Sequence, residues 1–272
     1  MISNITIGQY YPTGSVVHKL DPRLKLLSLI AYIVFIFLSG SVFSLLFISL
    51  FTLLLMGLTR IPMKVYLKNI KSILFIIILT AVLNIFYVSD GAVLVDWWIF
   101  HITTLGVRKA IFMAARIVLL ILMSAMLTYT TTPTFLTDAI ESLLSPLKFV
   151  GLSSAVHIVA MMMTIALRFI PTLVDETEKL MNAQKARGAD FESGGLLKRV
   201  KALLPILIPL LISSVRRAYE LSEAMESRCY TGSGNRTRLK QLKFSTKDAV
   251  AAALLVAAFC SVIVLNNISV PR

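Results

Sequence analysis

Apolar stretches of helical length recur along the first half of the chain, and a short polar segment follows each of them. Residues 24–38 and 42–58 are almost wholly apolar and are separated by Ser39, Gly40 and Ser41. At about 1.5 Å per residue, helices of these lengths are near, or slightly below, the ~30 Å thickness of the hydrocarbon core of a bilayer. The pattern therefore predicts two short membrane helices joined by a tight turn at Gly40.

Three later stretches have the same character, namely residues 72–88, 110–131 and 249–265. Together with the first pair they predict about five membrane-spanning helices. A count of six or seven stays open, because residues 149–167 contain no charged side chain and are long enough to span. The alternative for that segment is a long helix along the membrane surface, apolar in its first half and charged in its second.

The charges between the apolar stretches are unevenly distributed. Residues 59–71 contain four basic residues and no acidic one, whereas residues 89–105 contain two aspartates, two tryptophans and no lysine or arginine. Lys19, Arg23 and Lys25 surround the start of the first apolar stretch. Because Lys and Arg are retained on the cytoplasmic side of membranes, we expect a multi-pass protein of the cell membrane whose N-terminus is cytoplasmic.

The middle of the chain has a different composition. Residues 133–245 hold 25 of the chain's 41 charged residues, a density that lipid does not accommodate. The sequence therefore predicts three parts: residues 1–132 with four membrane helices, residues 133–245 as a cytoplasmic domain, and residues 246–272 with the last membrane helix. The expected fold class is an all-α integral membrane protein with about five transmembrane helices and a cytoplasmic or interfacial domain of long helices.

The overall composition agrees with a membrane protein. The chain is 57% hydrophobic and has a mean hydropathy of +0.83, whereas a soluble globular chain is about 45–50% apolar. Its net charge of +13 is explained by basic residues on the cytoplasmic side. Nucleic acid is not expected as a partner, since no soluble segment combines a basic stripe with stacking aromatic residues.

Motifs for a cofactor or for catalysis are missing from the sequence. The glycine-rich segment 232–238 has neither Lys nor Ser/Thr at the positions where a phosphate-binding loop needs them. Cys229 and Cys260 make neither a disulfide framework nor a ligand cluster, and the histidines are scattered. No apolar stretch carries the paired carboxylates of a membrane-embedded enzyme. We therefore expect no cofactor and no metal in this chain, and no enzymatic activity.

A short pattern, Leu-x-x-Ala-x-x-x-Arg, occurs twice in the charged domain, once ending at Arg187 and once at Arg228. Arginine in the last turn of a helix normally interacts with the exposed carbonyl groups there, and glycine favours the turn that follows. Two similar helix ends in the same compartment indicate more than a stop signal. The guanidinium group offers five donors and a permanent charge, so both ends are predicted to dock into partner proteins.

Three segments are similar to those of one known family, the transmembrane T components of energy-coupling factor (ECF) transporters, which include the cobalt-transport permease. Residues 15–25, Ser-Val-Val-His-Lys-Leu-Asp-Pro-Arg-Leu-Lys, resemble the segment that precedes the family's first membrane helix. Ala186-Arg187-Gly188 matches the family's Ala-Arg-Gly motif. Ser227-Arg228-Cys229 stands at the second motif and keeps only its arginine.

The resemblance implies a scaffold inside a vitamin or metal-ion importer. Two ABC-type ATPases on the cytoplasmic side bind ATP and Mg²⁺, and each would hold one of the two Arg-bearing ends: Ala186, Arg187 and Gly188, or Ser227, Arg228 and Cys229. A small substrate-binding membrane protein, the S component, would pack against the long helices. The uncharged run Met161, Met162 and Met163 has two interpretations that stay open, an adaptable surface for exchangeable partners or ordinary packing between helices.

Two other functions are considered. A conventional ABC importer permease also presents a cytoplasmic helix to its ATPase, and Glu223-Ala224-Met225 together with the position of Gly188 faintly resembles its loop motif. Such a permease would have its own substrate pathway, and it typically shows one docking end where this chain has two. A membrane-embedded enzyme such as a lipid transferase would need clustered Asp or His residues, which this sequence lacks.

Overall fold

The computed structural model describes residues 10–87, 93–97, 100–146, 153–191, 195–230 and 244–268. The chain divides into two compact units. One unit comprises residues 8–136 and 241–272, and we call it the bundle unit. The other comprises residues 1–7 and 137–240, and we call it the crossed-helix unit.

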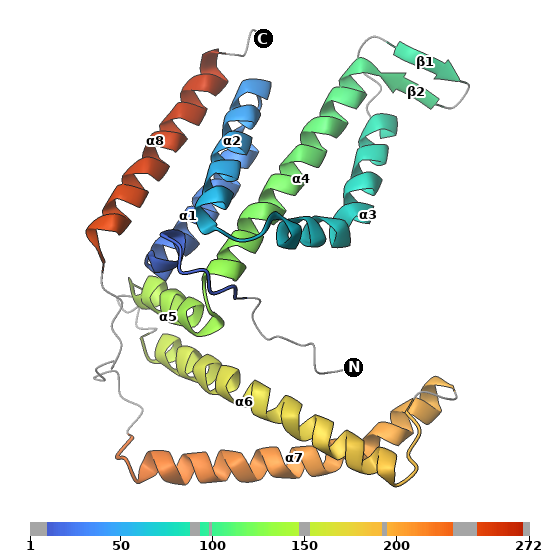
Figure 1. Cartoon of the computed structure of the whole chain (residues 1–272), viewed down its shortest axis with the longest axis vertical. Helices are drawn as coiled ribbons and strands as arrows, with labels where there is room; N and C mark the ends of the chain where they lie inside the picture. The colour runs from blue at the N-terminus through green and yellow to red at the C-terminus, as the bar shows by residue number, and fades with distance from the viewer. Residues whose placement is uncertain are drawn as a thin grey trace. The chain divides into compact units, whose positions relative to one another are not determined.

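Five long helices make up most of the bundle unit (Figure 1). They are α1 (Pro22–Leu38), α2 (Val42–Thr59), α3 (Met63–Tyr87), α4 (Thr104–Thr130) and α8 (Thr246–Ile268). Helix α4 packs against α1, α2 and α3, and α8 packs against α1 and α2. A short 3₁₀ helix, η1 (Val17–Lys19), precedes α1.

The segment between α3 and α4 contains the only strands found among the described residues. Strands β1 (Val93–Trp97) and β2 (Phe100–Thr103) pair antiparallel and form a small hairpin. The rest of the described regular structure is helical, so the all-α membrane class expected from the sequence is confirmed. The strands themselves were not anticipated, because only a few residues of the interval 89–105 alternate in polarity.

The predicted turn between the first two helices is confirmed, since α1 ends at Leu38 and α2 begins at Val42. Ser41 and Ser44 cap the start of α2 with reciprocal hydrogen bonds. The end of α1 is capped from a distant helix, where Arg116 of α4 donates from Nη2 to the carbonyl oxygen of Ser39 at 2.9 Å. This cationic donor suits the exposed carbonyls at a helix C-terminus.

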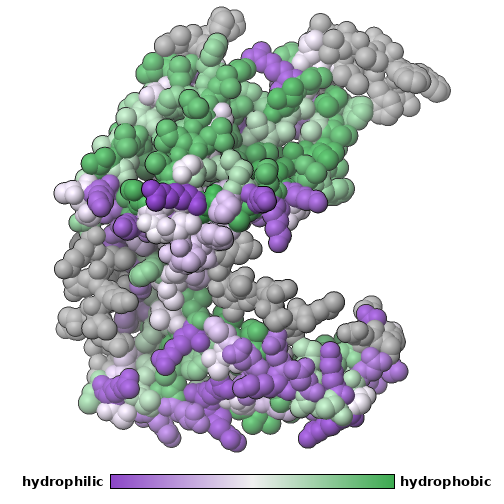
Figure 2. Space-filling model, viewed as in Figure 1, coloured by the Kyte–Doolittle hydropathy of each residue, from purple (hydrophilic) through white to green (hydrophobic). Residues whose placement is uncertain are grey.

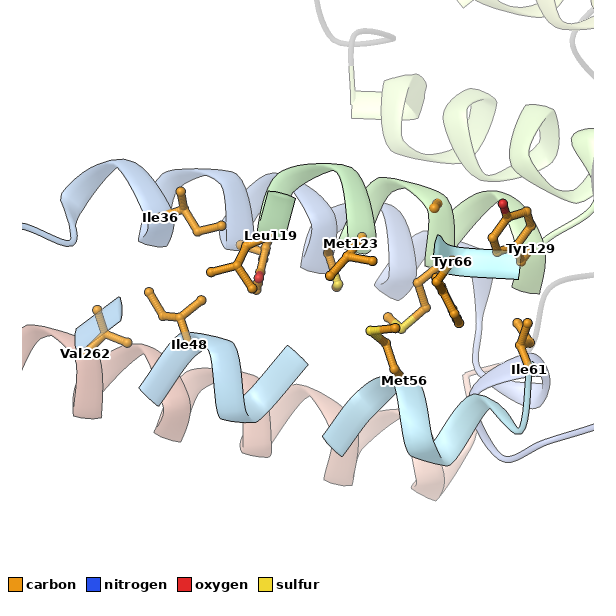
Figure 3. Close-up of a cluster of buried hydrophobic side chains, with 13 residues drawn as sticks. Ile36, Ile48, Met56, Ile61, Tyr66, Leu119, Met123, Tyr129 and Val262 are labelled. Carbon is orange, nitrogen blue, oxygen red and sulfur yellow. The ribbon is translucent and has the colours of Figure 1, made fainter. Parts of the chain in front are cut away.

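Buried side chains of α1, α2, α3, α4 and α8 make the core of the bundle unit (Figure 3). Ile48 of α2 and Leu119 and Met123 of α4 are less than a tenth exposed. A buried polar contact is satisfied within this core, because the Tyr32 hydroxyl lies 2.6 Å from Thr52 Oγ1. The face of the bundle unit visible in Figure 2 is largely apolar too, which fits helices that face lipid.

Five of the described helices are long and apolar enough to cross a membrane, judged by length and composition. The number agrees with the prediction, but the set differs. Helix α1 has 17 residues, about 25 Å at 1.5 Å per residue, which is short for a hydrocarbon core of about 30 Å. Residues 155–186 qualify in its place because their first half is apolar. They are the segment for which the sequence left both possibilities open.

Two long helices, α6 (Ser153–Ala186) and α7 (Leu196–Glu226), dominate the crossed-helix unit. Helix α5 (Pro133–Leu144) starts in the bundle unit and continues into this one. Pro171 lies inside α6, and Pro205 and Pro209 lie inside α7. A proline removes one backbone hydrogen bond and bends a helix, and Figure 1 shows α7 bent in its first half.

Candidate functional site

Helices α6 and α7 are joined by a carboxylate that uses both of its oxygens. Arg217 of α7 donates from Nη2 to Oε2 of Glu176 at 2.6 Å. The hydroxyl of Ser213, also on α7, donates to the other oxygen, Oε1, at 2.5 Å. Both charged side chains are less than a third exposed, so solvent screens the pair only in part. The two helices are therefore fixed to each other at this point.

The joining point lies equally far from both arginines that the sequence singles out. Glu176 and Arg217 are 41 residues apart, and this is also the spacing between Arg187 and Arg228. Arg187 comes 11 residues after Glu176, and Arg228 comes 11 residues after Arg217. Each arginine is therefore about 16 Å further along its helix than the contact, at 1.5 Å per residue. Figure 1 shows the C-terminal ends of α6 and α7 on opposite sides of the crossing.

Helix α6 ends in a hydrogen-bonded cap built on a glycine. Gly188 has a positive φ of 85°, a conformation that glycine adopts without steric cost. Its N–H donates to the carbonyl oxygen of Lys185 at 3.0 Å, and the N–H of Ala189 donates to that of Gln184 at 3.0 Å. This pair of bonds is the Schellman motif, in which Arg187 is the last residue before the left-handed one.

Helix α7 ends in the same motif although its sequence differs. The N–H of Cys229 donates to the carbonyl oxygen of Glu226 at 2.9 Å, and the N–H of Tyr230 donates to that of Met225 at 3.0 Å. Cys229 has a φ of 57°, although it is not a glycine. Every bond corresponds to one at the end of α6 when the numbering is shifted by 41. The structure thus shows that Ser227-Arg228-Cys229 has the same backbone form as Ala186-Arg187-Gly188.

The match between the two ends extends to side-chain burial. Leu180 and Leu221 are half-buried, whereas Ala183 and Ala224 are exposed at the corresponding positions. Leu221 lines a groove of about 320 Å³ between α6 and α7, together with Ile165 and Phe169. The leucine of the repeated pattern is therefore a packing position between the helices. The small side chain of the alanine adds little bulk to the surface near the arginine.

Both arginines lie on the surface with their donors available. Arg187 and Arg228 are exposed, and their guanidinium groups make no hydrogen bond or ion pair within the part of the chain that the structure describes. The flanking residues Ala186, Gly188, Ser227 and Cys229 are exposed as well. Gly232 and Gly234, which follow Arg228 in the sequence, lie outside the described residues.

The three methionines proposed as a partner surface lie on the first half of α6. Met162 and Met163 are 60% and 40% exposed, and Met161 is half-buried. A larger apolar surface on α7 escaped the sequence reasoning, although its spacing of three or four residues is that of one helix face. We call it the α7 apolar stripe. Its members are Leu197, Val200, Leu204, Leu207, Leu211, Val215 and Tyr219, each at least 47% exposed.

The described residues offer little for chemistry. No three His, Cys, Asp or Glu side chains among them are grouped so that they could hold a metal ion. His157 lies 3.6 Å from Glu141, an ion pair only when the histidine is protonated. The arrangement as a whole is one of two capped, arginine-bearing helix ends held on a common crossing, with apolar surface beside it. Exposed apolar surfaces of this kind mark contacts with proteins or with a membrane.

Comparison with known proteins gives consistent matches. Residues 13–239 match the family model CbiQ, described as cobalt transport protein. A protein of Ruminiclostridium cellulolyticum named energy-coupling factor transporter transmembrane protein EcfT is 49% identical over 268 residues, 98% of this chain and 99% of its own length. A protein of the same name from Clostridium kluyveri is 49% identical over 262 residues, 96% of each chain. Another from Bacillus subtilis is 42% identical over 259 residues, 95% of this chain and 97% of its own.

Proposed function

The chain belongs to the CbiQ family of cobalt transport proteins, as the transmembrane T component of an ECF transporter, and on this premise we propose that it couples two ATPases to a substrate-binding membrane protein. The chain itself is a multi-pass membrane protein and a transporter component. The relatives' name favours this proposal over a conventional permease with its own substrate pathway. In this scheme ATP and Mg²⁺ belong to the ATPases, and the cargo is a vitamin or a transition-metal ion.

The proposal rests on two equivalent arms, by which we mean residues 176–187 of α6 and 217–228 of α7. Arg187 and Arg228 stand at the ends of two helices that cross at Glu176 and Arg217, each the same length beyond the crossing. Both arginines are exposed, and each stands directly before the left-handed residue of the same backbone cap. Two equivalent helix ends suit two similar binding grooves (sockets), such as a dimer of ATPases offers. A guanidinium there would bind carboxylates and helix-end carbonyls in each socket.

The S component would bind apolar surface of the crossed-helix unit. The α7 apolar stripe, and Met162 and Met163 on α6, leave large hydrophobic side chains exposed, from 40% to 81%. An exposed apolar face of this extent marks a protein or membrane contact. Methionine is flexible and polarizable, so it adapts to different partners. We therefore extend the surface predicted at Met161, Met162 and Met163 to include α7.

The proposed mechanism is mechanical. Closure of the ATPase dimer on ATP would move the sockets together and carry the ends at Arg187 and Arg228 with them. The contact of Glu176 with Arg217 and Ser213 would make α6 and α7 move as a pair. Bending at Pro171, Pro205 and Pro209 would let the helices tilt without breaking. The tilt would reorient the S component, which then releases its cargo inward.

Removing the two arginines tests the docking. We expect Arg187→Ala and Arg228→Ala each to weaken the binding of the ATPases, and the double variant to abolish both co-purification and uptake. An anchoring arginine at an interface is worth about 2 kcal/mol or more, roughly 30-fold in affinity. The measurements are the ATPase content of the purified complex and substrate uptake by proteoliposomes.

Arg216→Ala is the matched control, because Arg216 is exposed on α7 but lies away from its capped end. This variant should bind the ATPases and support uptake like the parent. If the double variant kept its ATPases and its uptake at the parental rate, the docking assignment would be wrong. The same would follow if Arg216→Ala lost as much as the double variant.

A further inference from the structure

The segment ahead of α1 contains buried charges that the docking of the ATPases does not use. Lys25, in the first turn of α1, is only 7% exposed, and Asp21, which precedes the helix, is 5% exposed. Asp248, in the first turn of α8, is 2% exposed. Charged side chains are almost never buried to this degree unless they are paired. These three residues therefore form a buried polar cluster within the bundle unit.

Lys25 ties the start of α1 to the end of α4. Its ammonium group donates to the carbonyl oxygen of Thr130 at 3.0 Å and to Oγ1 of Thr131 at 3.3 Å. It also donates to the carbonyl oxygen of His18 at 3.2 Å. Thr130 is the last residue of α4 and Thr131 is its C-cap. All three protons of Lys25 thus serve to hold neighbouring backbone and side-chain oxygens in place.

Asp248 ties the start of α1 to the start of α8. Its Oδ1 accepts from the N–H of Asp21 at 2.8 Å, and its Oδ2 accepts from the N–H of Ser245 at 2.7 Å. Asp21 in turn caps α1, since its Oδ1 accepts from the N–H of Arg23 at 2.8 Å. The carboxylates of Asp21 and Asp248 both attract the Lys25 ammonium group. We call Asp21, Lys25, Thr130, Thr131 and Asp248 the anchor cluster.

The anchor cluster lies next to the two junctions that join residues 137–240 to the bundle unit. After Thr131, the chain enters α5 at Pro133 and passes into the crossed-helix unit at Thr137. It returns to the bundle unit at Gln241, shortly before Ser245 and the start of α8. Lys25 holds the outgoing connection and Asp248 holds the returning one, and Asp21 links the two. A single set of buried charges therefore holds the chain beside both ends of residues 137–240.

From this geometry we propose that Lys25, with Asp21 and Asp248, is a positioning site that anchors both ends of residues 137–240 at one point of the bundle. The proposal rests on the proposed coupling function, to which it adds the place where the moving unit is held. Two junctions held at one buried cluster would deliver force on the crossed-helix unit to a single point of the bundle. Movement of the arms would then act on the bound S component and would not be lost by separate stretching of either connection.

Hydrogen exchange measured on the complete complex in lipid nanodiscs tests the anchor directly. Lys25→Met keeps an unbranched side chain but leaves two buried carboxylates without their counter-ion. We expect amide exchange to rise at least tenfold in two separate segments, residues 129–136 and 244–250. Exchange in α3 and α7 should stay at parental rates. This measurement does not depend on whether the ATPases dock at Arg187 and Arg228.

Transport by the same variant tests what the anchor does. In proteoliposomes, Lys25→Met should hydrolyse ATP within twofold of the parental rate, while the substrate taken up per ATP hydrolysed falls at least tenfold. A purely structural defect would lower both in proportion. Lys19→Met is the matched control, because Lys19 is an exposed lysine just before the cluster, and it should match the parent in exchange and in transport.

Asp248→Asn is a milder second variant that keeps the shape of the side chain. It should raise exchange in both segments by a smaller factor, and it decides the matter if Lys25→Met does not fold. The proposal is overturned if only one of the two segments responds, if neither does, or if exchange rises throughout the chain in Asp248→Asn. It is also overturned if uptake per ATP stays parental while both segments exchange faster.

Discussion

At the scale of single residues, the informative positions are those whose backbone or environment is unusual for their type. Cys229 adopts a left-handed conformation that glycine holds at the matching position 188. Nothing in its sequence neighbourhood announces this, because the Ala-Arg-Gly motif is reduced there to Ser227-Arg228-Cys229. Only the hydrogen bonds from Cys229 and Tyr230 show that the cap is preserved. The backbone form is therefore more constant than the residues that build it.

Replacing Cys229 by glycine should stabilise the end of α7. A side chain in the left-handed region costs roughly 1 kcal/mol, which glycine avoids. Exchange of the Tyr230 amide, which is bonded to Met225, should slow about fivefold. Cys229→Ala is the control, since it removes the thiol and keeps the Cβ atom, and it should leave the exchange unchanged. Equal slowing in both variants would assign the effect to the thiol and contradict the backbone argument.

At the scale of elements, the repeated pattern acquires its meaning from the packing of α6 on α7. The sequence shows two similar helix ends, but it does not show where the helices meet. The contact of Glu176 with Arg217 places the crossing so that both arms have the same length. Prolines interrupt backbone hydrogen bonding ahead of the crossing: Pro171 five residues before Glu176 in α6, and Pro205 and Pro209 twelve and eight residues before Arg217 in α7. Helices α6 and α7 are thus held together at the Glu176–Arg217 contact and can bend at their prolines.

The contribution of this contact can be measured with Glu176→Gln, Arg217→Gln and the double variant. Glutamine at 176 keeps an acceptor for Ser213 but loses its charge. For a pair that is partly buried, we expect a coupling free energy of about 1 kcal/mol from the double-mutant cycle. Thermal unfolding of the purified complex gives the values. In Arg216→Gln, the exposed neighbour, no coupling to Glu176 should appear, and equal coupling there would contradict a specific pair.

At the scale of the whole molecule, the chain combines a lipid-facing bundle with a charged unit of crossed helices. Figure 2 shows hydrophobic residues over the visible face of the bundle unit and many hydrophilic ones over that of the crossed-helix unit. The exposed side chains of α2 and α3 include Leu50 at 67% and Phe75 at 76%. Water disfavours such a surface and lipid does not. The basic residues 59–71 and the acidic interval 89–105 lie at opposite ends of α3.

The orientation expected from these charges is open to direct measurement. With Cys229 and Cys260 replaced by alanine, Lys64→Cys should react with a membrane-impermeant thiol reagent only from the cytoplasmic side. Trp97→Cys should react only from outside. The reason is that loops rich in Lys and Arg stay in the cytoplasm. Labelling with the opposite sidedness would put the arms at Arg187 and Arg228 on the side without ATPases.

Much of the fold could be predicted from the sequence because lipid imposes a simple rule on it. Helices in a bilayer must be long and apolar and must satisfy their own backbone groups, so the turn at Gly40 and most membrane helices followed from hydropathy. Length decided less clearly between α1 and α6, since α1 has 17 residues and α6 begins with an apolar half. The hairpin of β1 and β2 was missed because its strands are short and mixed in polarity.

By itself, the sequence determined the class of protein, the charged middle domain and the two arginine-bearing helix ends, since hydropathy, charge and helix-stop signals act locally along the chain. The tertiary structure alone decided that Glu176 meets Arg217, that Arg116 caps α1, and that Lys25 and Asp248 share one buried cluster. Each of these contacts joins residues far apart in the chain. Polar groups removed from water must find partners wherever packing places them, and local patterns do not encode those partners.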